Sequence, residues 1–85
     1  MNSVSEVMDL NLGEAAKELD ALRARLTDSD FNESEFATRL NGVLWHLRAS
    51  WNGRHLSLNE AGALGLVEFD ALGSSPIKLP GFSTQ

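Results

Sequence analysis

The sequence predicts a mainly α-helical fold: a small three-helix domain at residues 1–73, followed by an extended or disordered C-terminal tail at residues 74–85. Three helix starts are each marked by a capping residue with a glutamate three residues later. Apolar residues after the first two starts recur at steps of three and four, as on one face of a helix. With 85 residues, the chain can form one modest core and no second domain.

The first helix is predicted over residues 12–26. Asn11 is a capping residue, and Glu14 follows at the position that closes a capping box. Leucine and alanine then form one stripe along the predicted helix, comprising Leu12, Ala15, Ala16, Leu19, Leu22 and Leu26. The other faces are charged, so this stripe is expected to face the core.

The second helix is predicted over residues 33–51. Asn32 and Glu35 form the cap pair, and Phe31 and Phe36 stand where a hydrophobic staple packs the residue before the cap onto the fourth helical residue. The predicted apolar stripe consists of Phe36, Leu40, Val43, Leu44, Leu47 and Trp51.

A β-hairpin at residues 43–58 is the alternative, which would make the fold α+β with two N-terminal helices. Apolar and polar residues alternate there, and Asn52-Gly53 is a favoured two-residue hairpin turn. We prefer the helix because the phenylalanine staple already commits residues 33–40 to it. Gly53 is then expected to end the helix in the left-handed conformation.

The third helix is predicted to begin after Ser57, which is followed by Glu60, and to extend to about residue 64. Residues 67–72 either continue this helix or pair as a strand. The tail contains two prolines and has no apolar period, so it is expected to be extended or disordered. Its apolar side chains could dock on a groove: Ile77, Leu79 and Phe82.

The formal charge of −5 is unevenly distributed along the chain. Residues 1–38 hold nine acidic and three basic residues, whereas no acidic residue lies between Glu35 and Glu60. This acid-free window contains three arginines, both histidines and both tryptophans. We interpret the pattern as an acidic first helix beside a basic second helix, because three arginines are few for a polyanionic partner.

The composition excludes several kinds of site. Without cysteine the chain can form neither a disulfide nor a thiolate metal site. No apolar run approaches the eighteen residues of a transmembrane helix, and the N-terminus lacks the pattern of a secretory leader. A cytoplasmic location with no membrane contact is therefore expected.

A calcium loop is only partly matched. Asp28, Asp30 and Asn32 match the first three ligand positions of an EF-hand loop. The sixth position, where the loop needs glycine, is Glu33, and the twelfth, where it needs a bidentate carboxylate, is Arg39. These residues are therefore interpreted as a loop and a helix cap.

Other catalytic and metal motifs are also incomplete. His46 and His55 are nine residues apart, and no third nitrogen or sulfur ligand lies nearby in the sequence. A zinc site would therefore need carboxylates from elsewhere in the chain. No serine lies in a nucleophile elbow, and there is no glycine-rich phosphate loop. We expect no catalytic residue, no metal site and no cofactor, and we do not expect an enzyme.

The remaining prediction is a small acidic adaptor or regulatory protein that acts through protein–protein contacts, as a homodimer or as a subunit of a complex. In a helix, Trp45 lies off the apolar stripe beside Arg48 and is expected to be exposed, as binding tryptophans often are. The predicted partner-binding residues are Trp45, Arg48, Arg54 and His55. The alternative is a nucleic-acid-binding module that uses the acid-free segment at residues 39–55, although the few arginines speak against nucleic acid.

Overall fold

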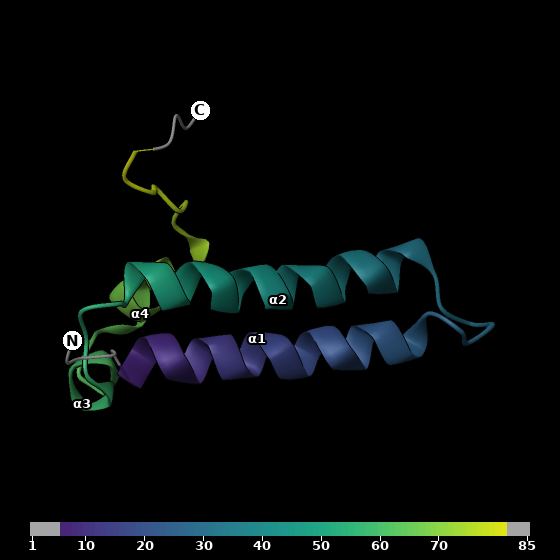
Figure 1. The fold of residues 1–85 in the computed structure, drawn as a ribbon, viewed down its shortest axis with the longest axis horizontal. Coiled ribbons are helices and arrows are strands. Elements are labelled where there is room, and N and C mark those ends of the chain that lie inside the picture. Colours follow the sequence, from purple (N-terminus) through teal and green to yellow (C-terminus); the bar gives the residue numbers. More distant parts are fainter. Residues whose placement is uncertain (1–5, 82–85) are drawn as a thin grey trace.

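The computed structural model describes residues 6–81, which form four helices (Figure 1). The two long helices run antiparallel and side by side, and the two short ones gather at the end of the hairpin where the first helix begins. The prediction of a mainly α-helical fold is confirmed. In chain order the helices are α1 (Glu6–Arg25), α2 (Glu33–Asn52), α3 (Leu58–Gly62) and α4 (Leu66–Ser74).

The first helix begins upstream of the predicted start, and the prediction that Asn11 caps it is wrong. Asn11 lies inside α1, is only 8% exposed, and its Nδ2 donates to the Val7 carbonyl at 3.0 Å. A side-chain amide inside a helix can donate a hydrogen bond to the carbonyl four residues earlier. Asn11 makes this bond, so it is accommodated within α1 instead of capping its start.

The buried line of α1 is also shifted from the predicted stripe. The residues buried against the rest of the fold are Val7, Asn11, Ala15 and Leu22. Of the predicted stripe only Ala15 and Leu22 are buried, whereas Leu12, Leu19 and Leu26 are 47%, 45% and 57% exposed. The polar Asn11 takes a core position that a hydrophobic pattern cannot reveal, and leucines predicted to be core remain at the surface.

The predicted start of α2 is confirmed. Asn32 Oδ1 accepts a hydrogen bond from the backbone N–H of Glu35 at 2.9 Å. The Phe31 and Phe36 rings meet edge to face with their centroids 6.3 Å apart, which forms the predicted staple. Together they fix where the chain enters the second helix.

The predicted helix over residues 33–51 is confirmed, and the alternative β-hairpin at residues 43–58 does not form, because α2 extends to Asn52 and residues 6–81 contain no strand. The left-handed conformation predicted for Gly53 is wrong, since its φ is −101°. Glycine has a different use here: a Cβ at this position would lie 2.7 Å from Val7 Cγ1. Gly53 therefore lets the end of α2 approach the start of α1.

The region after Gly53 forms two short helices where one was predicted. The Ser57 and Glu60 capping box is confirmed, with bonds of 3.1 and 2.8 Å. The chain then breaks at residues 63–65, and residues 67–72 belong to α4 rather than to a strand. Residues 6–81 therefore contain one more helix than the three predicted.

The tail contacts the end of α2. Asn52 Nδ2 donates to the carbonyls of Leu72 and Ser75, both at 2.9 Å, and Trp51 Nε1 donates to the carbonyl of Lys78 at 3.2 Å. Ile77 and Leu79 are 36% and 41% exposed. The tail prediction for residues 82–85, including the docking of the last phenylalanine, lies outside the described residues.

The core of the described region is thin. Its buried apolar residues are mostly small: Val7, Ala15, Leu22, Val43, Ala49 and Ala61. Many leucines are at least one-third exposed. Between residues 6 and 81, none of the helices combines the length and hydropathy required to cross a membrane.

Candidate functional site

The prediction that Trp45 is exposed is wrong. Trp45 is only partly exposed, and its indole lies on Gly73 of α4, where any Cβ would overlap the ring. Phe69 of the same helix lies beside it, with the ring centroids 5.7 Å apart. Trp45 therefore holds α4 against α2, and its part in partner binding stays a prediction.

The other predicted partner-binding residues do not gather around Trp45. The Arg54 guanidinium lies 3.9 Å from the centroid of Trp51 and donates to the Trp51 carbonyl at 2.8 Å. Arg48 is partly buried, and His55 is exposed in the turn after α2. The structure thus gives Trp45 and Arg54 different neighbours rather than one common surface.

A different surface, which the sequence did not single out, begins on α1. Leu10 lines a cavity together with residues of α3 and α4, so this side of α1 faces the two short helices, although Leu10 itself is 49% exposed. Each residue advances about 100° around a helix, which places Leu12 roughly 160° away from Leu10 on the opposite side. Leu19 and Leu26 follow at seven-residue intervals and share the side of Leu12. All three leucines are at least 45% exposed.

The same side of the hairpin is apolar on α2. Trp45 points at α4, so Leu47, two residues later, lies on the opposite side of the helix. Leu40 and Phe36 precede Leu47 by seven and eleven residues and share its side. Leu47 and Phe36 are 37% and 38% exposed. We call this surface the open face; its residues are Leu12, Leu19, Leu26, Phe36, Leu40 and Leu47.

The open face is large for so small a protein. Each long helix has 20 residues, which corresponds to about 30 Å of length. Two packed helices together are roughly 20 Å wide, so the face covers about 600 Å². This area is that of the whole side of the hairpin, polar residues included, and the exposed apolar side chains on it mark a candidate interaction site.

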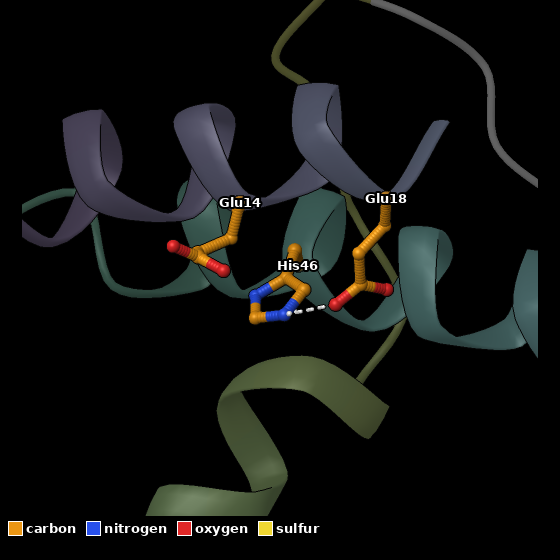
Figure 2. Close-up of side chains that lie close together, drawn as sticks. All are labelled: Glu14, Glu18 and His46. Carbon is orange, nitrogen blue, oxygen red and sulfur yellow. Dashed lines mark ion pairs between the residues drawn. The ribbon is translucent and has the colours of Figure 1, made fainter. Parts of the chain in front are cut away.

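A carboxylate–imidazole cluster lies between the long helices, formed by Glu14 and Glu18 of α1 and His46 of α2 (Figure 2). One ligand atom from each side chain lies within 4.8 Å of the others, and His46 Nε2 is 3.2 Å from Glu18 Oε2. All three side chains are partly exposed. Glu14 also pairs with Lys17 at 3.1 Å.

The neighbours of the cluster orient its members. His46 Nδ1 lies 2.7 Å from Oδ1 of the buried Asn11. Glu18 lies over Gly42, where a Cβ would come within 2.6 Å of Oε1. Sequence analysis missed the cluster because Glu14 and Glu18 are distant from His46 along the chain, and only the register of α1 against α2 brings them together.

An ion-pair network closes the other end of the hairpin. Arg25 binds both oxygens of Glu35 at 2.7 and 2.8 Å, and Arg39 binds the same carboxylate at 2.7 Å. Hydrogen bonds from Arg25 and Arg39 lower the pKa of Glu35 to about 2. Asp28 and Asp30, the residues of the partial calcium motif, also pair with Arg25. This network joins α1 to the start of α2.

Comparisons with protein families, with curated proteins and with solved structures found no match to this chain.

Proposed function

We propose that this protein acts through protein–protein contact, as an adaptor or regulatory module whose chains pair in a homodimer through the open face. The observation that carries the proposal is the row of partly exposed apolar side chains on the side of the hairpin that α3 and α4 leave bare. An uncovered apolar surface is stabilised when a second apolar surface removes it from water.

We favour a second copy of the chain as the partner that covers the open face. Two open faces of about 600 Å² would bury roughly 1,200 Å² in total, the lower end of the range for specific interfaces. Two antiparallel hairpins packed face to face would form a four-helix bundle, in which a two-fold axis places identical leucines on both sides. The thin core of one chain would then become part of a larger one.

The described basic residues support nucleic-acid binding less well. Arg39 pairs with Glu35, and Arg54 lies over the Trp51 ring. Glu35 offsets the charge of Arg39, whereas Arg54 keeps its charge on the Trp51 ring, and with so few arginines the segment offers little positive charge to a phosphate backbone.

A charged substitution in the open face tests the proposal. Leu19→Lys should raise the dimer dissociation constant by about 100-fold or more, because a symmetric interface would bury one unpaired lysine from each chain. The matched control is Leu66→Lys on α4, where the leucine is 89% exposed and lies outside the open face. Dissociation constants from sedimentation experiments, with helix content checked by circular dichroism, would measure both effects.

Two outcomes would contradict the proposal. One is a Leu19→Lys variant that associates as tightly as the unmodified chain. The other is equal weakening by Leu66→Lys, which would mean that association does not depend on the open face.

A further inference from the structure

We propose that Glu14, Glu18 and His46 bind one divalent transition-metal ion of the zinc class. An imidazole nitrogen together with carboxylate oxygens suits Zn²⁺ and its neighbours in the first transition row. The site is separate from the open face, and the proposal does not depend on how the chains associate.

The hydrogen bonds of Asn11 determine which nitrogen of His46 is free. Asn11 Nδ2 donates to the Val7 carbonyl, so the amide oxygen is the atom that faces His46 Nδ1 at 2.7 Å. An amide oxygen only accepts hydrogen bonds, and Nδ1 must therefore carry the proton of this contact. The other ring nitrogen of a metal-binding histidine usually donates to a carboxylate, a backbone carbonyl or water, and the Asn11 amide oxygen can accept the same hydrogen bond.

The free nitrogen, Nε2, is directed at Glu18. It lies 3.2 Å from Oε2, and a neutral imidazole would present a lone pair to a carboxylate that also has only lone pairs (Figure 2). This contact is favourable only with a positive charge between or on the two groups, either a proton on Nε2 or a metal ion. Glu14, one helical turn before Glu18, brings a second carboxylate to the same point and so supplies a third ligand for a metal ion.

The spacing of the three side chains fits a metal site. Zinc bonds to nitrogen and oxygen are about 2.0–2.2 Å long, so ligand atoms around a tetrahedral ion lie roughly 3.4 Å apart. The atoms of the cluster lie within 4.8 Å of one another, and small rotations of the two carboxylates would close the difference. Among the described residues, Lys17 pairs with Glu14 and would compete with a metal ion for its carboxylate. The Lys17 side chain is 73% exposed, so an ion can easily displace it into water.

Gly42 provides the space for Glu18. Glycine is the weakest helix former apart from proline, yet it lies in the middle of α2. A Cβ there would come within 2.6 Å of Glu18 Oε1, so a side chain at position 42 would displace the carboxylate. The glycine therefore keeps the carboxylate over α2 and next to His46.

Three protein ligands leave one position of a tetrahedral ion for water or another small ligand. Glu14 and His46 also line an apolar cavity of about 360 Å³ whose walls include Leu10, Trp45 and Phe69. Two of the three proposed ligands thus border a cavity whose volume is within the usual range for small-molecule sites.

Isothermal titration with ZnCl₂ near neutral pH tests the site. We expect saturable binding of one Zn²⁺ per chain, and an absorption spectrum of bound Co²⁺ that shows nitrogen and oxygen ligands. Glu18→Gln, which keeps the size of the side chain, should lower the affinity at least about 10-fold, and His46→Ala should abolish saturable binding. Gly42→Ala should weaken binding because it displaces Glu18.

The matched controls are His55→Ala and Glu33→Gln, which change an exposed histidine and an exposed glutamate outside the cluster and should leave the affinity unchanged. Circular dichroism of each variant shows whether it remains folded, and Glu18→Gln keeps the test valid if His46→Ala unfolds. The proposal is overturned if the unmodified chain binds no Zn²⁺ saturably, if a folded Glu18→Gln binds it as tightly as the unmodified chain, or if His55→Ala weakens binding as much as Glu18→Gln. The dimer proposal is tested by chain association measured without zinc, so it and the zinc proposal can fail independently.

Discussion

Gly73 allows one methyl group to test how α4 packs on α2. Alanine at this position would place its Cβ in overlap with three carbon atoms of the Trp45 indole. Either the ring or the helix must move, and overpacking of this kind costs about 1–3 kcal/mol. Alanine also favours a helix over glycine by roughly 0.5–1 kcal/mol, so the net loss of stability should be near 1 kcal/mol.

Gly13→Ala is the matched control, because Gly13 lies inside α1 with nothing within 4 Å of its would-be Cβ. This variant should gain about 0.5–1 kcal/mol from helix propensity alone. Urea unfolding at one fixed protein concentration, followed by circular dichroism, would measure both free energies of unfolding. The reasoning is refuted if Gly73→Ala is as stable as Gly13→Ala.

Three further predictions concern the contacts that hold the hairpin and α4. Hydrogen bonds from Arg25 and Arg39 lower the pKa of Glu35 from 4.5 to about 2, so their stabilisation is present above pH 4.5 and is lost as the pH falls toward 2. The difference in unfolding free energy between the unmodified chain and Glu35→Gln should therefore be constant above about pH 5.5 and shrink between pH 4.5 and 2 in urea titrations. Trp45→Ala should destabilise the fold by about 2 kcal/mol, below the 3–5 kcal/mol of a fully buried aromatic, and a change under 0.5 kcal/mol in the same assay would contradict its packing on Phe69. Asn52→Ala should lower the free energy of unfolding by about 1–2 kcal/mol and speed amide hydrogen exchange in α4, because it removes two hydrogen bonds to carbonyls at the end of that helix. Unchanged exchange in α4 would count against this role of Asn52.

Local sequence signals predicted helix starts well where the hydrogen bonds and contacts involved join residues close together in the sequence. The Asn32 cap, the staple of Phe31 with Phe36 and the Ser57 capping box all occur as predicted, because each depends only on neighbours in the sequence. The same logic failed at Asn11. A capping residue and a buried amide look identical in sequence, and the start of α1 at Glu6 together with the contact of Asn11 with His46 distinguishes them.

Features that depend on helix packing were not predictable. Trp45 was expected at the surface because nothing in the sequence shows that Gly73 and Phe69 return to cover it. The cluster around His46 likewise depends on the register of α1 against α2. The open face consists partly of leucines predicted to be core, since hydrophobic periodicity identifies an apolar face without identifying what covers it.

If the open face pairs two chains as we propose, the mass of the unmodified protein in solution must depend on its concentration. Sedimentation equilibrium over a wide concentration range should give twice the chain mass of 9.3 kDa at high concentration and a decrease toward one chain on dilution. A mass of one chain at every concentration, together with cooperative unfolding, would contradict the claim, because a single chain would then be stable with its open face in water.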